Sequence, residues 1–276
     1  MSWRQSVPPG TAAWATAQTG AAIVAALPLP GAWLANHLLV MADGRELVLR
    51  RWARPGWDVE DPDLTAAREA VVLERLEPTD VPAPRLVAAD PHATVCDVPT
   101  LLLERLPGEP PVGRPPIGPL LDVLAAIHAV DPDGIPPYRR YHEREGLRVP
   151  EWAGDTSVWE RALDVFASPP PDLPEVLIHR DFHPGNTLWE GATLTGVVDW
   201  TTGSRGPAAV DLGHLRVNLV LDHGPRVADA LLPHPEHHPY YDVVCALDAI
   251  GDLQANQPRA ALLRVEDHVA RALAEL

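Results

Sequence analysis

The stretch of residues 176–200 decides the fold, and it reads VLIHRDFHPGNTLWEGATLTGVVDW. Within it, residues 187–189 and 194–198 are short apolar runs separated by a Glu-Gly turn, which predicts a β-hairpin. Asn186 precedes the first predicted strand and Asp199 follows the second. Because a hairpin brings its outer ends together, an amide oxygen and a carboxylate should meet there. Both are ligands that Mg²⁺ accepts in proteins, so the sequence predicts a magnesium site.

A third polar side chain, Asp181, lies five residues before Asn186 in a loop that Pro184 and Gly185 keep irregular. In phosphoryl transfer, an Asp takes the proton of the acceptor hydroxyl while an Asn and a second Asp hold Mg²⁺. Residues 179–186 have the spacing His-Arg-Asp-x-x-x-x-Asn of such a catalytic loop. We therefore predict a kinase catalytic loop, and the alternative for Asp181 is a turn-forming residue of a Pro-Gly loop.

The composition excludes whole classes of chemistry. All 22 basic residues of the 276-residue chain are arginine, so Schiff-base chemistry and a lysine-bearing phosphate loop are excluded. No apolar run approaches the roughly 20 residues that span a bilayer, and we expect neither a signal peptide nor a membrane anchor. Cys96 and Cys245 are far apart and fit neither a zinc site nor a disulfide framework. These features favour the cytoplasm, where ATP is available.

The charge of the chain is unevenly distributed. The formal net charge is −16, of which residues 1–107 carry −4 and residues 108–276 carry −12. Such a field repels nucleic acid and anionic membranes, so neither is expected as a partner, and it attracts cationic small molecules to the second part. The alternative is that the acidity only keeps the protein soluble.

The first part of the chain predicts strands and one helix. Residues 37–41 and 46–51 flank an Asp-Gly turn, which indicates a hairpin. Thr65 is the predicted N-cap of a helix ending near Leu76, and its apolar stripe includes Glu69. A carboxylate that faces a core needs a cationic partner, and Arg50 is the candidate. The alternative places Glu69 at the edge of the stripe, in water.

The second part predicts mainly helices. A strand at 100–103 is followed by residues 106–119, which are rich in Pro and Gly and indicate a boundary between lobes. Predicted helices then follow, the third behind an N-cap Asp211, at residues 120–130, 158–166, 212–221 and 260–276. The His-rich segment 234–239 indicates an exposed loop rather than a metal site. Strands followed by helices predict an α+β chain in two lobes.

The sequence resembles the aminoglycoside phosphotransferase family, small-molecule kinases with the protein-kinase fold. The resemblance covers roughly residues 25–255 and rests on motifs at 47–50, 68–69, 103–108, 127–129, 179–186, 196–200 and 206–212. It implies a two-lobed protein-kinase-like fold with a small, β-rich N-lobe over residues 1–107, which binds nucleotide, and a larger, mainly helical C-lobe over residues 108–276, which carries the catalytic loop and the acceptor site. Trp200 replaces the Phe-Gly of protein kinases, which points away from protein substrates.

The resemblance also implies a role for each motif residue. Asp181 would be the catalytic base, and Asn186 and Asp199 would bind Mg²⁺. In the nucleotide site, which would take ATP or GTP, Arg50 would pair with Glu69 and contact phosphate, and the backbone from Glu104 to Leu106 would bind adenine. Asp211 would brace the catalytic loop, and His179 looks structural.

Two features depart from the family pattern. Many relatives have Lys where this chain has Arg50, and Arg51 is an alternative for the phosphate contact. The loop expected to cover the phosphates, residues 29–36, contains a single glycine.

Several acceptors fit a kinase of this kind. Our first hypothesis is an antibiotic kinase that phosphorylates an aminoglycoside or another cationic natural product. The second is a kinase of a metabolite alcohol such as choline, homoserine or a sugar, because fold and catalytic loop do not specify the acceptor. A third is a nucleotide-binding protein without catalysis. Acids and aromatic faces hold ammonium groups, and the candidates are Asp155, Trp159, Glu160, Asp222, Asp248 and Asp252. Nothing in the sequence favours one oligomeric state.

Overall fold

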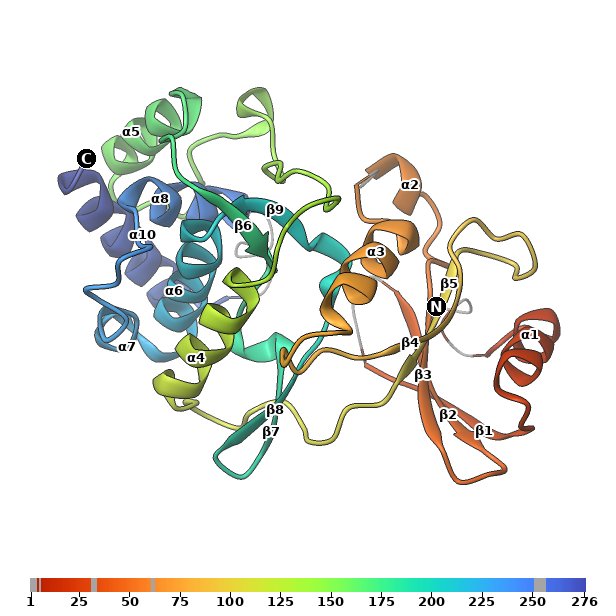
Figure 1. Cartoon of the computed structure of the whole chain (residues 1–276). Coiled ribbons are helices and arrows are strands. Elements are labelled where there is room, and N and C mark those ends of the chain that lie inside the picture. The colour runs from red at the N-terminus through yellow and green to blue at the C-terminus, as the bar shows by residue number, and fades with distance from the viewer. Residues whose placement is uncertain (1–3, 5, 31–33, 61–62, 251–256) are drawn as a thin grey trace. The chain divides into compact units, whose positions relative to one another are not determined.

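The computed structural model describes residues 4, 6–30, 34–60, 63–250 and 257–276. The chain forms two compact units (Figure 1). The first contains Met1–Glu109 and Leu188–Gly203, and the second contains Pro110–Thr187 and Ser204–Leu276. The predicted boundary after residue 107 lies close to the observed one after Glu109. The predicted second lobe is not continuous, however, because the segment Leu188–Gly203 returns to the first unit.

Backbone hydrogen bonds explain why that segment returns. Trp189 and Glu109 exchange N–H···O bonds of 2.9 and 3.1 Å, and the Val197 N–H donates to the Pro82 carbonyl at 2.8 Å. The segment begins with the predicted hairpin, formed by β7 (Thr187–Glu190) and β8 (Thr193–Val197). A short 3₁₀ turn, η4 (Trp200–Thr202), follows.

A five-stranded antiparallel sheet forms the centre of the first unit. In spatial order its strands are β1 (Ile23–Pro28), β2 (Ala35–Met41), β3 (Glu46–Arg51), β5 (Thr100–Glu104) and β4 (Leu86–Asp90). The structure confirms the hairpin of β2 and β3. Gly44, at φ +89°, makes the tight turn between them possible.

The two faces of this sheet are covered differently. Helix α1 (Pro9–Thr19) packs Trp14 against Leu39 and Leu49 on one face. Helix α3 (Ala66–Leu76) follows the short α2 (Trp57–Glu60) along the chain and contacts β4 and β5. The predicted cap is present, since Thr65 Oγ1 accepts the Arg68 N–H at 3.1 Å. Because side chains alternate along a strand, Leu49 faces α1 and Arg50 faces α3.

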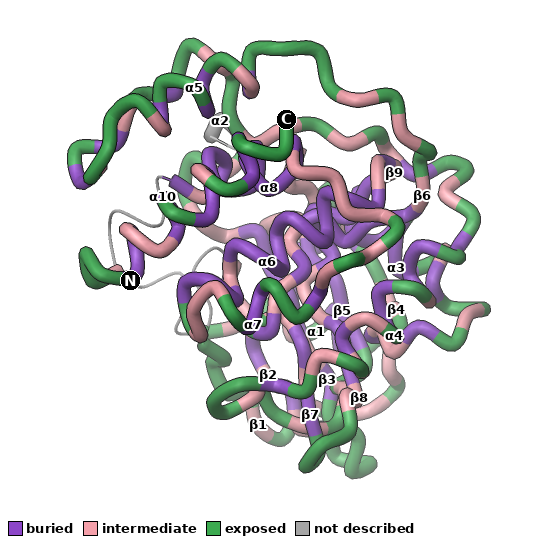
Figure 2. Tube along the Cα trace, turned by 90° about the vertical axis from the view of Figure 1, so that its left-hand side faces the viewer, coloured by how far each residue is buried: buried purple, intermediate pink, exposed green. Residues whose placement is uncertain are grey.

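The second unit is mainly helical. Its elements are α4 (Ile117–His128), η2 (Arg144–Gly146), α5 (Thr156–Ala167), β6 (Glu175–Ile178), η3 (Pro184–Asn186), β9 (Ser204–Pro207), α6 (Ala209–His223), α7 (Pro225–Asp229), α8 (Pro239–Asp248) and α10 (Arg259–Ala274). Helix α6 contacts α7, α8 and α10, and Figure 2 shows it as an almost continuously buried segment. A Cβ at Gly213 would lie 2.6 Å from the Tyr241 carbonyl oxygen, so a glycine lets α6 and α8 approach closely.

Helices α4 and α6 each begin three residues before the predicted start. Helix α4 begins at Ile117 rather than at residue 120, because a proline is tolerated in the first turn and Pro119 therefore does not delay the helix. Helix α6 begins at Ala209 with Ala208 at the N-cap position, so Asp211 is not the cap. Its carboxylate is directed to the catalytic loop instead. No helix in the described parts of the chain is long and apolar enough to cross a membrane.

Candidate active site

The first unit contains a buried ion cluster around Arg50. Arg50 Nε donates to Glu69 Oε2 at 3.1 Å, which is the predicted pairing. Its terminal nitrogen NH2 donates to Asp199 Oδ1 at 2.7 Å and to Thr201 Oγ1 at 2.9 Å. Strand β3, helix α3 and the segment after β8 therefore meet at one guanidinium. The planar fork of arginine suits such simultaneous contacts.

Burial and the neighbouring charges shift the pKa values of Glu69 and Arg50. Glu69 is 1% exposed, and its desolvation raises the pKa of the carboxyl to about 7, while Arg50 counteracts the rise. Burial also acts to lower the pKa of Arg50, but the carboxylates of Glu69 and Asp199 outweigh it and the pKa rises. The arginine therefore stays charged and holds two acidic partners in place.

The neighbouring Arg51 has a different role. It points to the opposite face of β3, where its NH2 lies 2.5 Å from Asp97 Oδ2. The other oxygen of Asp97 accepts the Thr11 hydroxyl at 2.7 Å, so Arg51 helps to attach the N-terminal helix. Strand alternation places Arg50 beside Asp199 and Arg51 beside Asp97 on the opposite face, so Arg50 is the better candidate for the phosphate contact.

Asp199 has the backbone and the exposure of a ligand-binding residue. It adopts a left-handed conformation, with φ 65° and ψ 59°, which is uncommon outside glycine and is often found at functional sites. Its side chain is 46% exposed, whereas its partner Arg50 is buried. Thr201 donates its hydroxyl to Asp199 Oδ1 at 2.8 Å. Oδ1 thus has two protein donors, and the carboxylate keeps an exposed surface for a cation.

The predicted hinge lies at the end of β5. The Glu104 N–H donates to the Arg85 carbonyl at 2.9 Å and is committed to the sheet, whereas Leu106 lies beyond the strand. A Cβ at Gly196 would meet Leu106 Cδ1 at 2.8 Å and Leu188 Cδ1 at 3.2 Å, so these leucines flank Gly196 closely. They form an apolar surface beside the hinge.

The catalytic loop belongs to the second unit. Asn186 Nδ2 donates to Asp181 Oδ2 at 3.1 Å and to the Asp181 carbonyl at 2.9 Å. The amide nitrogen therefore faces Asp181, and the amide oxygen of Asn186 is the atom left for a cation. Thr187 donates its hydroxyl to the Pro184 carbonyl at 2.7 Å and closes the Pro-Gly turn.

A fully buried carboxylate braces this loop. Asp211 accepts the His179 N–H at 2.9 Å and the Arg180 N–H at 2.7 Å. His128 Nε2 lies 3.1 Å from the same carboxylate, and His128 Nδ1 lies 3.0 Å from Glu236 Oε2. Burial acts against the charge of His128, but both carboxylates outweigh it and raise the pKa to about 9. His128 is consequently a cation between two acids.

The His-rich segment takes part in this brace. It is a partly buried loop, since its Glu236 bonds His128 and His237 Nε2 lies 2.8 Å from Asp242 Oδ2. The exposed loop that the sequence predicts is therefore incorrect. Across the described residues, no group of His, Cys, Asp and Glu could hold a metal ion by itself.

Arg180 is a strained and buried member of the loop. Its φ is 71°, and its guanidinium lies 3.9 Å from the ring centroid of Tyr141 and 5.7 Å from that of Tyr138. The charge of Arg180 acts on the buried carboxyl of Asp248. Burial raises the pKa of this carboxyl to about 7, and the positive charge of Arg180 opposes the rise. A partly protonated carboxyl is a weak partner for an ammonium group.

The acceptor candidates do not gather at one place. Asp155 caps α5 by accepting the Ser157 N–H at 2.9 Å, and Glu160 and Asp222 are exposed on helices α5 and α6. Trp159 is 0% exposed and donates its indole N–H to Glu266 at 2.9 Å, so it offers no surface to a ligand. Asp252 lies outside the described residues, as do residues 31–33 of the expected phosphate-covering loop.

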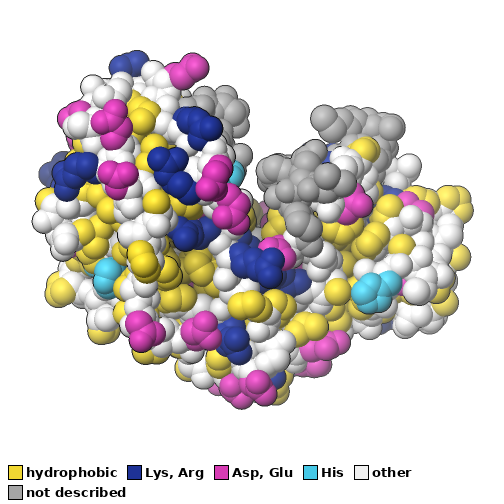
Figure 3. Space-filling view, turned by 90° about the horizontal axis from the view of Figure 1, so that it is seen from above, with side chains coloured by type: hydrophobic (Ala, Val, Ile, Leu, Met, Phe, Trp, Pro, Cys, Tyr) yellow, Lys and Arg dark blue, Asp and Glu magenta, His cyan; other side chains and the backbone are white. Residues whose placement is uncertain are grey.

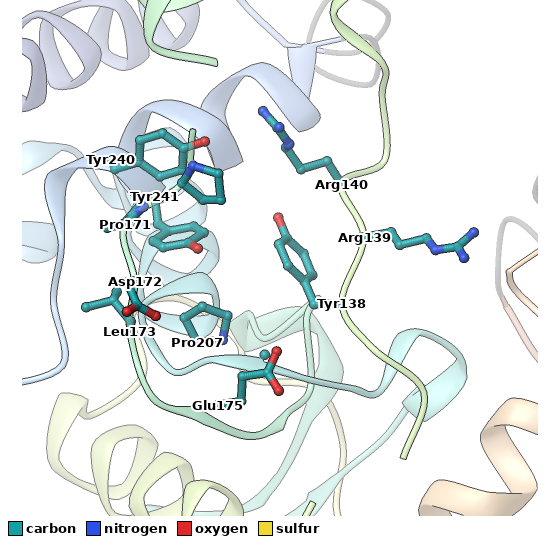
Figure 4. A pocket seen from close by; sticks show the side chains of 12 residues that line it. Tyr138, Arg139, Arg140, Pro171, Asp172, Leu173, Glu175, Pro207, Tyr240 and Tyr241 are labelled. Carbon is teal, nitrogen blue, oxygen red and sulfur yellow. The ribbon is translucent and has the colours of Figure 1, made fainter. Parts of the chain in front are cut away.

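The acidic side chains form no single patch on the face shown in Figure 3, where arginine and acidic residues are interspersed. A cavity of about 400 Å³ does open in the second unit (Figure 4). Tyr138, Arg140, Tyr240 and Tyr241 line it, together with prolines. No described acceptor candidate lines this cavity.

Sequence reasoning missed four polar residues, Thr201, His128, Glu236 and His214. Thr201 lies two positions after Asp199. His128 belongs to one of the motifs that support the family resemblance, but the sequence assigned it no role. Glu236 was part of the segment read as an exposed loop. Helical spacing from Asp211 also places His214 at the loop, a signal that was available in the sequence.

A comparison with protein-family models identifies the family of the chain. The model of a phosphotransferase enzyme family, abbreviated APH, matches residues 26–247. A search of curated proteins found no match.

Solved structures share the fold at low identity. A thermostable mutant of aminoglycoside phosphotransferase APH(4)-Ia, in a ternary complex with ADP and hygromycin B, has a TM-score of 0.65 and 16% identity, with 96% of this chain and 99% of that chain covered. The macrolide 2'-phosphotransferase MphH from Brachybacterium faecium has a TM-score of 0.57 and 23% identity, with 94% and 96% covered. The likeness establishes the two-lobed, kinase-like α+β fold.

Proposed function

Because the chain belongs to the phosphotransferase enzyme family, a family of small-molecule kinases, we propose that it transfers the γ-phosphate of ATP to a hydroxyl group of a small molecule. The observation that carries this proposal is the catalytic loop. Asp181 is held by Asn186, and the backbone before it is held by the fully buried Asp211. Such bracing is expected where an atom must be positioned for chemistry.

The proposed reaction assigns a role to each group. Asp181 accepts the proton of the acceptor hydroxyl. The oxygen of that hydroxyl forms a bond to the γ-phosphorus, and the bond between the γ-phosphorus and ADP breaks. Arg50 contacts the phosphates, and the pairing with Glu69 fixes its orientation. Leu106 and Leu188 offer an apolar surface for the base, and the hinge backbone at Glu104 and Leu106 supplies its polar contacts.

The donor set of Asn186 and Asp199 fits Mg²⁺. Both offer hard oxygen atoms, and Mg²⁺ in such sites takes one or two protein ligands together with waters and phosphates. When bound, the ion neutralises charge on the phosphate oxygens. Asp199 is half exposed and fixed by Thr201, and the Asn186 amide oxygen faces away from Asp181, so both residues keep a coordinating atom.

For the acceptor, the leading candidate class is an aminoglycoside or another cationic natural product, which would make the biological role antibiotic resistance. The net charge of −12 on residues 108–276 supports it. A metabolite alcohol is the alternative, and the partial protonation of Asp248 favours it, because a neutral carboxyl attracts no cation. Two buried, free cysteines and the need for ATP support a cytoplasmic setting.

The test begins with a thermal-shift titration using ATP or GTP and Mg²⁺, alone and with aminoglycosides, macrolides, amino alcohols and sugars. A ligand that binds the native state raises Tm. We expect a nucleotide shift that requires Mg²⁺ and a further shift from one acceptor class. The responding compounds then go into a turnover assay, in which Asp181→Ala should lower kcat by about 10² or more. Full turnover in that variant would refute the role of Asp181, and a missing nucleotide shift would support a non-catalytic protein.

A further inference from the structure

Helix α6 presents a second polar side chain to the catalytic loop, one turn beyond Asp211. His214 follows Asp211 by three residues, a spacing that places both on one face of a helix. Asp211 accepts the backbone N–H groups of His179 and Arg180. His214 Nδ1 lies 3.5 Å from Oδ1 of Asp181. The same helix face therefore contacts three successive residues of the loop.

The imidazole of His214 has a reason to face this carboxylate. The residue is 8% exposed, and within the described residues neither ring nitrogen makes a hydrogen bond. Buried polar atoms are nearly always paired, and Asp181 Oδ1 is an acceptor within reach of Nδ1. A separation of 3.5 Å is slightly longer than a good hydrogen bond, and a small rotation of either side chain would close it.

The two oxygens of the Asp181 carboxylate have different neighbours. Oδ2 accepts the amide N–H of Asn186 at 3.1 Å, whereas Oδ1 faces His214. A second histidine, His183, lies farther away, with Nε2 3.9 Å from Oδ1, and its Nδ1 already accepts the Gly185 N–H. The side chain of His183 is 28% exposed and that of His214 is 10% exposed, so His214 is the more firmly packed of the two.

The surroundings keep the His214 ring neutral. Burial lowers its pKa, and of the charged groups around it Asp181 and Asp211 oppose this while His183 and Arg180 reinforce it. The ring also packs edge-on against Tyr141, with centroids 6.2 Å apart. A neutral imidazole with its proton on Nδ1 can donate to Asp181 without cancelling the negative charge of the base.

We propose that His214 is a positioning residue for phosphoryl transfer, whose Nδ1–H holds Oδ1 of Asp181 while Asn186 holds Oδ2. Held at both oxygens, the carboxylate cannot rotate about its last bond away from the acceptor hydroxyl. Such fixation lowers the cost of reaching the reactive geometry. The inference rests on the proposed function, since Asp181 acts on an acceptor only if the protein is a kinase.

A matched pair of substitutions tests the role in catalysis. His214→Asn keeps an N–H donor near the position of Nδ1, whereas His214→Leu removes it. With the acceptor found by screening, His214→Leu should lower kcat by about 10- to 100-fold, the cost expected for a misplaced catalytic group. The KM for ATP should stay the same, and His214→Asn should recover most of the lost kcat. Equal kcat in both variants, with Tm values close to that of the wild type, would overturn the proposal.

A second readout does not need turnover. The pKa of His214 is measured by NMR titration of the histidine ring signals in the wild type and in Asp181→Asn, with His214→Asn used to assign the signal. If His214 faces the carboxylate, loss of the negative charge should lower its pKa further. An unchanged pKa contradicts the contact, even in an active enzyme. If no acceptor is turned over while the pKa does fall, the proposed function fails and the contact between His214 and Asp181 stands.

Discussion

The cation His128 makes the stability of the protein depend on pH above neutrality. The ring lies 3.1 Å from Asp211 and 3.0 Å from Glu236, and its pKa is raised from 6.5 to about 9. A group whose pKa is higher in the folded state stabilises the fold fully below its unfolded pKa. That contribution is lost as the pH rises through the folded pKa. We therefore expect the free energy of unfolding to fall between about pH 6.5 and about pH 9.

The size of the effect follows from the two pKa values of His128. A difference of about 2.5 units between 6.5 and 9 corresponds to a total of roughly 3 kcal/mol. About 2 kcal/mol of this should disappear between about pH 7.5 and about pH 9.5, where the folded-state ring loses its proton. Burial raises the pKa of Glu69 and of Asp248 to about 7, so most of their titration is complete below this window.

Urea unfolding followed by tryptophan fluorescence measures the change, at several pH values across this window. His128→Gln should remove most of the pH dependence, whatever its effect on stability at neutral pH. Glu236→Gln removes one of the two acidic partners and should give an intermediate slope. A wild-type stability that stays constant or rises with pH would refute the reasoning. So would an equal loss in wild type and His128→Gln, because the titrating group would then lie elsewhere.

Three further predictions concern the first unit. Arg50→Gln should weaken Mg²⁺-dependent ATP binding and lower stability by about 3–5 kcal/mol, because it leaves Glu69 buried without a cation. Arg51→Gln on the opposite face should leave ATP affinity unchanged and cost less stability than Arg50→Gln, because its partner Asp97 is 39% exposed and stays hydrated, whereas Glu69 is 1% exposed. Calorimetric titration and urea unfolding measure both variants, and equal ATP affinities would contradict the assignment of Arg50. Gly108→Ala should destabilise the protein by about 1–3 kcal/mol, since φ is +93° and the new Cβ would lie 2.5 Å from Thr195 Oγ1. Gly118→Ala, in open space at the start of α4, is the control, and urea unfolding should find it neutral or slightly stabilising. Asp199→Ala should abolish the Mg²⁺-dependent part of the ATP-induced shift in Tm, and a shift of wild-type size would exclude this carboxylate as a ligand.

Local patterns predicted much of the fold. The Asp-Gly turn, the Thr65 cap and the strand alternation each depend on residues close in sequence, and the structure confirms the elements they predict. The first residues of helices were predicted less accurately, because a proline or an acidic residue can stand at more than one position of the first turn. Asp211 shows the limit, since a side chain that fits an N-cap can instead turn toward a distant loop.

The ambiguity between Arg50 and Arg51 shows what local patterns leave open. Two neighbouring arginines on one strand differ only in the face to which they point, and the identity of each face depends on which helix packs there. Helix α3 brings Glu69 to one face, and Asp97 reaches the other. Only the packed sheet decides which arginine lies beside Asp199.

The sequence by itself predicted the chemistry, because the proposed catalytic loop holds Asp181 and Asn186 within a few residues and Asp199 directly follows a predicted hairpin. Tertiary structure alone decided which groups support that chemistry. His128 lies on α4, Asp211 and His214 lie on α6, and Glu236 lies in the loop before α8, so these side chains meet at the loop only in the packed structure. Tertiary structure also buried Trp159 and shifted the pKa of Asp248, since desolvation depends on everything that surrounds a side chain and not on its neighbours in sequence.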